Sequence, residues 1–246
     1  MTAWFSQMLL GRQAASGRLC HIQRSILRTI VYVDGYNLYY GLLRNSPYKW
    51  LNLFKLFQEY VLKDADVLEV RYYTAPVLGT MCDDPESQQR QRIYVQALRK
   101  MPPNKVRIIE GKIVASTPFL RLVTPIPGQP NRTHAQVYTL NEKNTDVNLA
   151  SDLITGAWTN ACDQAVICTN DTDLSGALAA VRLHHPDIIL GLVAPIPGND
   201  HRKMASDLTM QTNWSKSLSP VHLANAQLPE KIPNTSIRRP EKWKGD

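Results

Sequence analysis

The 246-residue chain has little cysteine: only four residues, at Cys20, Cys82, Cys162 and Cys168. No two of them form a CxxC pair, and no set of cysteines and histidines has zinc-finger spacing. Cys168 lies in an apolar segment, where a free cysteine packs as a small hydrophobic residue. This pattern argues against structural zinc and indicates a reducing, cytoplasmic setting.

Long apolar runs are also absent, since none approaches the ~20 residues that a membrane-spanning helix needs. Hydrophobic residues make up 43% and charged residues 20%, as in ordinary globular proteins. The chain contains no internal repeat, no low-complexity tract and no convincing Ser-His-Asp triad. We therefore expect a soluble protein with no membrane partner.

Acidic residues are missing from residues 1–28, which hold four of the 28 basic residues. Without that stretch the formal charge falls from +7 to +3, which argues against coating nucleic acid by charge alone. The stretch superficially fits an organelle targeting peptide, but a disordered tail or an over-assigned start codon fits as well. We predict a basic, disordered extension over 1–28 and a single domain over 29–246.

From residue 29 onward, segments rich in Val, Ile and Tyr alternate with amphipathic segments. The expected strands are 29–34, 67–75, 105–114, 164–169 and 187–194. The expected helices are 36–44, 52–62, 84–100, 146–160, 174–184 and 200–210. This alternation is typical of βαβ units, so we predict an α/β fold with helices around a mostly parallel sheet.

Two segments depart from this rhythm. Residues 116–141 contain four prolines and predict a turn or hairpin excursion. The C-terminal segment from Leu228 has too few apolar residues for a core of its own, so we expect it to wrap over the domain.

Four aspartates follow predicted strands or open a predicted helix. Asp34 ends the first strand in "VYVDGYN", and Asp171 and Asp173 follow the strand 164–169. Asp146 opens a helix, where Thr145 is a fair N-cap and an acid suits the helix dipole. Each has an ordinary interpretation as a turn or cap. Ligands of parallel α/β sheets bind beyond the carboxyl ends of strands, however, and the aspartates converge there.

Carboxylates that meet within ~5 Å would repel by roughly 3 kcal/mol per pair at an effective dielectric near 20. Such a cluster must take up protons or a cation, and an all-oxygen ligand set favours Mg²⁺ or Mn²⁺. A bound divalent ion can lower the pKa of an attacking water and stabilise a leaving oxygen. The aspartates therefore point to phosphodiester hydrolysis.

Two further residues are weaker candidates. Asp152 lies six residues beyond Asp146, about 240° around the helix, so the two do not share a face. It is either an exposed residue or a support for the site. Asn37 either caps backbone N–H groups or orients Asp34 and contacts the scissile phosphate.

Three motifs resemble the NYN domain family of PIN-like nucleases: "YVDGYNLYYG", "EKNTDVNLASDL" and "TNDTDLSGAL". The resemblance covers roughly residues 29–243, and "ANAQLPEKI" with "RRPEKW" is similar to the end of the bacterial LabA-like (DUF88) group. It implies a three-layer α/β/α fold and a metal-dependent endoribonuclease site at the C-terminal edge of the sheet.

Residue by residue, the resemblance implies catalytic and metal-binding roles for Asp34, Asp146, Asp171 and Asp173. It implies a catalytic or phosphate-contacting role for Asn37, a further acid at Asp152, and a phosphate contact at Lys143. The family often has Ser-Gly before the acidic pair and a proline after it; here Thr169-Asn170 and Gly176 stand in those places. The missing proline makes the start of the following helix less certain than the metal site.

The resemblance favours RNA, in single-stranded form, as the partner, and leaves homo-oligomerisation open. Several basic residues could contact phosphate or be surface charges: Arg90, Arg92, Arg99, Arg121, Arg132, Arg202 and Lys203. The tyrosines of the first helix could stack a base, although aromatic residues there are more often core. Two other functions compete: an RNA-binding or scaffolding protein with an inactive site, and a haloacid-dehalogenase-like phosphatase suggested by "DTDLS".

Overall fold

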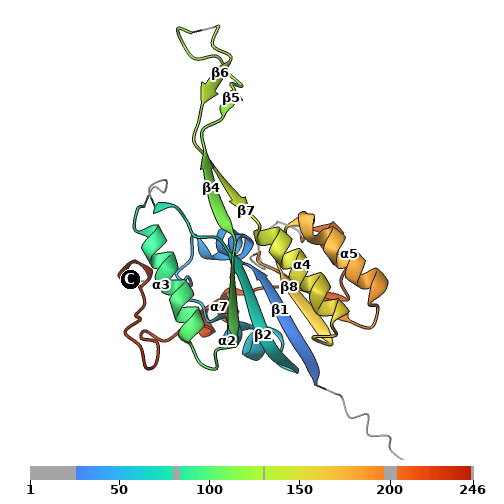
Figure 1. Cartoon of the computed structure of the whole chain (residues 1–246). Helices are drawn as coiled ribbons and strands as arrows, with labels where there is room; N and C mark the ends of the chain where they lie inside the picture. Colours follow the sequence, from blue (N-terminus) through green and yellow to red (C-terminus); the bar gives the residue numbers. More distant parts are fainter. Residues whose placement is uncertain (1–25, 80–83, 130, 197–203, 245–246) are drawn as a thin grey trace, which may run out of the picture.

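A computed structural model describes residues 26–79, 84–129, 131–196 and 204–244 (Figure 1). Its centre is a six-stranded sheet in the order β10-β9-β8-β1-β2-β3, with every neighbouring pair parallel. The strands are β1 (Leu27–Asp34), β2 (Ala65–Thr74), β3 (Val106–Glu110), β8 (Gln164–Cys168), β9 (Ile189–Ala194) and β10 (Trp214–Ser217). The predicted parallel sheet is therefore confirmed.

A hydrophobic cluster covers each face of the sheet. Each strand contributes to both clusters, because its successive side chains point to opposite faces. In β1, Val31 and Val33 pack into one hydrophobic cluster, whereas Ile30 and Tyr32 pack into the other. Strands buried on both faces read as continuous apolar runs, as these do. The three-layer α/β/α architecture expected from the sequence follows.

The helices divide between the two faces (Figure 1). One face carries α2 (Leu53–Lys55), which continues as a π-helical turn over Leu56–Val61, together with α3 (Ser87–Lys100) and α7 (Pro220–Asn225). The other carries α4 (Thr145–Trp158), α5 (Ser175–His184) and α6 (Ser206–Thr209). Residues 200–203 of the expected helix 200–210 lie outside the described residues.

The prediction of a single strand over 105–114 is wrong, because two separate strands lie on either side of Gly111. Before it, β3 joins the main sheet; after it, β4 (Lys112–Ser116) pairs antiparallel with β7 (Thr139–Lys143). A Cβ on Gly111 would lie 2.5 Å from the Thr145 hydroxyl, so glycine lets the chain pass close to the start of α4. The predicted hairpin excursion is present as this ribbon, extended by β5 (Phe119–Arg121) and β6 (His134–Gln136), and it projects from the domain (Figure 1).

The C-terminal segment lies against the helical layer that contains α3. The Trp50 indole N–H donates to the Pro229 carbonyl oxygen over 2.8 Å, and Ile232 is fully buried. The Trp243 ring packs near those of Trp50 and Tyr94. Within the described residues, no helix has the length and apolar character that crossing a membrane requires.

Candidate functional site

The sheet reverses its order of strand addition between β1 and β8. From β1 the chain builds outward through β2 and β3, then returns to place β8 on the other side of β1 and builds outward through β9 and β10. At such a switch point the loops after the two strands diverge and leave a crevice where ligands of α/β proteins bind. Asp34 ends β1 at this point, and Asp171 follows β8.

Asp34 is almost completely buried, with 3% of its surface exposed. One carboxylate oxygen accepts a hydrogen bond from the Asn37 backbone N–H at 2.9 Å, so Asp34 caps the short helix α1 (Gly35–Leu38). The other oxygen accepts from the Thr169 hydroxyl at 2.9 Å. Burial raises the pKa of Asp34, the two hydrogen bonds oppose that rise, and the charge of Asp171 adds to it.

The loop after β8 is held by its own polar groups. The Thr169 hydroxyl accepts from the Asp171 backbone N–H at 3.1 Å while it donates to Asp34. Asp171 then caps a single 3₁₀ turn over Thr172–Leu174 by accepting from the Asp173 backbone N–H at 3.1 Å. Asp171 is partly buried and Asp173 is exposed, so both carboxylates are accessible from solvent.

Asp146 lies in the first turn of α4 and completes the set of acids. Burial, as the largest cause, and the charges of Asp34, Glu142, Asp171 and Asp173 together raise its pKa to about 6. Carboxylates from β1, the β8 loop and α4 therefore lie close enough to interact electrostatically. Their convergence on one metal ion stays a prediction.

The start of α4 differs from the sequence-based expectation that Thr145 is the N-cap. The helix begins at Thr145, after Asn144 in a left-handed conformation with φ 77°. The Glu142 carboxylate accepts from the Thr145 backbone N–H at 3.1 Å and also from its hydroxyl. Glu142, at the end of the ribbon, therefore fixes the helix start and is a fourth carboxylate near Asp146.

The donor set consists of carboxylate oxygens, which are the ligands that a hard divalent cation prefers. The described residues nevertheless contain no ready-made group of three or more His, Cys, Asp or Glu side chains placed to hold a metal. Mg²⁺ commonly binds through one or two carboxylates and keeps several waters, so such an open arrangement is compatible with it.

Asp152, the weaker candidate, is bonded to β2. It lies six residues after Asp146, about 9 Å further along the axis of α4. Its carboxylate accepts a hydrogen bond from the Tyr73 hydroxyl at 2.8 Å. The Arg71 guanidinium lies 3.9 Å from the same oxygen. Asp152 therefore ties α4 to β2 beneath the site.

Asn37 links the two loops of the crevice. Its side-chain oxygen accepts a hydrogen bond from the Asn170 backbone N–H at 3.0 Å, across 133 residues of sequence. The Asn170 side chain in turn accepts from the Ala205 N–H at 2.9 Å. Asn37 thus satisfies a backbone donor, as one interpretation expected, but the donor belongs to the β8 loop rather than to its own helix.

The basic candidates are spread over the molecule. Lys143 is exposed at the end of β7, directly before α4. Arg90 is buried and paired with Asp84 and Glu86, and Arg99 pairs with Glu110 at 2.6 Å. Arg202 and Lys203 lie outside the described residues.

The sequence interpretation did not assign roles to Thr169, Asn170 or Glu142. Thr169-Asn170 was noted only as a departure from Ser-Gly, yet both residues bond to the first acidic motif. The retained hydroxyl at position 169 was the available signal. Glu142 stands three residues before Thr145, a spacing that could have suggested a contact at the helix start.

Comparisons with known proteins bear on this site. The NYN domain model matches residues 28–212. The chain is 34% identical over 239 residues to 6-hydroxy-3-succinoylpyridine 3-monooxygenase HspA of Pseudomonas putida, covering 89% of this chain and 76% of that protein. A crystal structure of a protein of unknown function from Vibrio parahaemolyticus matches with a TM-score of 0.48 and 12% identity, covering 81% of this chain and 98% of that one. The last match is too distant to inform function.

Proposed function

The chain belongs to the NYN domain family, which has a PIN-like nuclease fold, and from this premise we propose that it is a metal-dependent endoribonuclease. The proposed site is the crevice between the ends of β1 and β8. Its proposed substrate is single-stranded RNA, and the reaction is hydrolysis of a phosphodiester bond.

One observation carries the proposal: the pKa of Asp146 is raised by burial and also by the charges of Asp34, Asp171 and Asp173, which come from two other elements. Folding gathers these like charges although they destabilise one another. Perturbed carboxylates at a strand-end crevice are a functional-site signature. A structural role would be served better by hydrogen-bonding residues without charge.

In the proposed site, Asp34, Asp146, Asp171 and Asp173 would hold Mg²⁺ or Mn²⁺. When bound, such an ion supplies a water of lowered pKa and stabilises negative charge on a phosphate. The chain orients its own ligands: Thr169 and the Asn37 N–H fix the Asp34 carboxylate. Asn37 holds the β8 loop beside β1, and Lys143 would contact substrate phosphate.

The direct test is cleavage of a labelled single-stranded RNA by the wild type and by Asp171→Asn, with Mn²⁺ or Mg²⁺ and with EDTA. Asparagine can still accept the hydrogen bond that caps the 3₁₀ turn, so the fold should survive. We expect the variant to lose at least 100-fold in rate. Cleavage at the wild-type rate would reject the proposed role of Asp171.

Two controls separate the competing functions. RNA binding that persists in EDTA, without cleavage after Mn²⁺ is restored, would support the scaffolding alternative. Phosphate release from a small monoester would support the phosphatase alternative.

The monooxygenase relative supports a second candidate, oxidation of a small aromatic acid, because 34% identity extends over most of the chain. A cleft lined by tyrosines adjoins the acidic crevice and is large enough for such a ring. This candidate predicts consumption of 6-hydroxy-3-succinoylpyridine in the presence of O₂ and a two-electron reductant. If 6-hydroxy-3-succinoylpyridine is not consumed under these conditions and RNA is cleaved, the nuclease function is favoured.

A further inference from the structure

A cleft of about 680 Å³ lies beside the acidic crevice. Its walls come from α1 with the π-helical turn Tyr39–Leu43, the start of α3, the base of the β4–β7 ribbon and the C-terminal segment. The volume is typical of small-molecule sites. Six aromatic residues line it: Tyr36, Tyr39, Tyr40, Tyr72, Tyr94 and Trp243.

The cleft adjoins the acidic residues through two of its lining residues. Gly35 lines the cleft and directly follows Asp34; Glu142 lines it and raises the pKa of Asp146. A Cβ on Gly35 would lie 2.8 Å from the Tyr72 ring, so glycine allows that ring to pack against the end of β1. A ligand in the cleft would therefore lie next to the carboxylates.

The aromatic wall is partly open to solvent. Tyr72 and Tyr94 are buried, but Tyr39 is 37% exposed and Tyr40 is 57% exposed. The sequence favoured a core position for these helix tyrosines, and for Tyr39 and Tyr40 that is wrong. Exposed aromatic rings at a cleft are suited to stacking on a planar ligand, since every base has a π-face.

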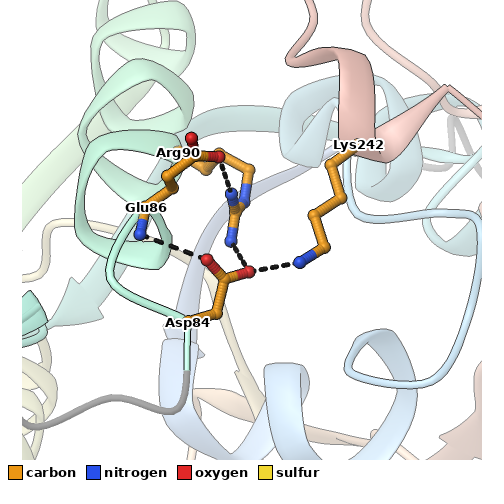
Figure 2. A network of polar contacts seen from close by, with 4 residues as sticks. All are labelled: Asp84, Glu86, Arg90 and Lys242. Carbon is orange, nitrogen blue, oxygen red and sulfur yellow. Dashed lines mark hydrogen bonds and ion pairs between the residues drawn. The ribbon is translucent and has the colours of Figure 1, made fainter.

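The charged residues that line the cleft have an excess of positive charge: Arg44, Lys49, Arg90 and Lys242 against Asp84 and Glu142. Figure 2 shows Asp84 shared between Arg90 and Lys242, with Glu86 pairing Arg90 at 3.0 Å. These contacts anchor the C-terminal segment to the start of α3 and neutralise much of the local charge.

Two further cations of the cleft are not neutralised in this way. Within the described part of the chain, neither Arg44 nor Lys49 has an ion-pair partner; Arg44 lies 5.5 Å from the Tyr40 ring centroid. The pKa of Lys49 is lowered by burial and by the nearby charges of Arg90 and Lys242. An anion placed here would relieve that repulsion.

We propose that this cleft is the nucleotide subsite of the enzyme: an unpaired base packs against Tyr39 and Tyr40, and its phosphate binds between Arg44 and Lys49. This inference rests on the proposed function and adds where the RNA binds. The adjacent nucleotide would then place its phosphodiester bond at the acidic crevice. RNA-binding proteins commonly stack splayed bases on aromatic side chains in this manner.

The test is calorimetric titration of the full chain with adenosine 5′-monophosphate in EDTA, so that the result does not depend on metal or cleavage. Tyr40→Ala should weaken binding about tenfold, the loss expected for one stacked ring, whereas Tyr40→Phe should keep it. Arg44→Gln and Lys49→Gln should each weaken binding several-fold. Adenosine and ribose 5-phosphate, which carry only one of the two features, should bind more weakly.

Matched controls are Tyr138→Ala and Lys63→Gln, which alter exposed residues outside the cleft. Equal weakening by cleft and control variants would overturn the proposal, as would tighter binding of 6-hydroxy-3-succinoylpyridine than of the nucleotide. Nucleotide binding without any RNA cleavage would reject the nuclease and leave the subsite standing. Cleavage that is insensitive to every cleft variant would reject the subsite alone.

Discussion

The Thr169 hydroxyl donates a 2.9 Å hydrogen bond to the Asp34 carboxylate, although 135 residues separate them in sequence. This bond joins the ends of β1 and β8 at the switch point of the sheet. It holds a buried charge in place at the centre of the candidate site.

Thr169→Val should therefore damage both stability and activity. Valine has a similar shape but leaves one oxygen of the buried Asp34 without its donor, at a cost of about 1–3 kcal/mol in the free energy of unfolding. Urea denaturation at pH 7.5 measures the first effect and RNA cleavage the second. Thr169→Ser, which keeps the hydroxyl, should restore most of both; failure of serine to do so would count against the hydrogen bond.

Asp146→Asn should change how stability depends on pH in EDTA. The folded state raises the pKa of Asp146 from 3.8 to about 6, so it binds the proton more tightly than the unfolded chain does. Wild-type stability should rise as pH falls from about 7 to 4, and the variant should lack this contribution. At pH 7.5 the variant should be more stable by about 1 kcal/mol, after allowance for screening of a half-buried group.

A matched control for that comparison is Asp187→Asn, at an exposed position before β9. It removes an exposed carboxylate of the same kind at a position outside the candidate site. Adding Mn²⁺ at pH 7.5 should then stabilise the wild type more than Asp146→Asn. Equal stabilisation of both would show that Asp146 does not hold the ion.

Asp152→Asn should separate structural support from chemistry. Its carboxylate accepts from Tyr73 and lies near Arg71, which also pairs with Glu69 at 2.6 Å. We expect a loss of about 1 kcal/mol in stability, because a charge-assisted hydrogen bond becomes a neutral one. RNA cleavage below the melting temperature should stay within a few-fold of the wild type, and a loss comparable to that of Asp171→Asn would assign Asp152 to the reaction.

Lys143→Gln should weaken RNA binding with little effect on the cleavage rate at saturating RNA. An exposed lysine that contacts one phosphate contributes about one unit to the slope of log affinity against log salt concentration. Binding isotherms at several salt concentrations measure that slope, with Lys63→Gln as the reference. A slope equal to that of the wild type would remove Lys143 from the interface.

Much of the fold could be predicted from local patterns. The apolar runs at 29–34 and 164–169 correspond to β1 and β8, because strands buried on both faces must be apolar throughout. The acids at Asp34 and Asp171 could be placed at the same edge because parallel strands end together. Helix boundaries such as 146–160 came within two residues of α4.

Other elements depend on partners that no local pattern reveals. β10 is short and carries polar residues, and it becomes a strand by pairing with β9. The division of 105–114 at Gly111 depends on how closely the chain passes the start of α4.

The sequence by itself determined the alternation of strands and helices, because that alternation follows from local hydrophobic patterns. It also determined the candidate acids, because they stand at the ends of predicted strands and at the start of a predicted helix. Tertiary structure alone decided which acids interact, that Asp152 bonds to Tyr73 instead, and that tyrosines, Arg44 and Lys49 line one cleft. The physical reason is that hydrogen bonds and charge interactions depend on distances in space. Those distances are set by packing between segments more than 100 residues apart.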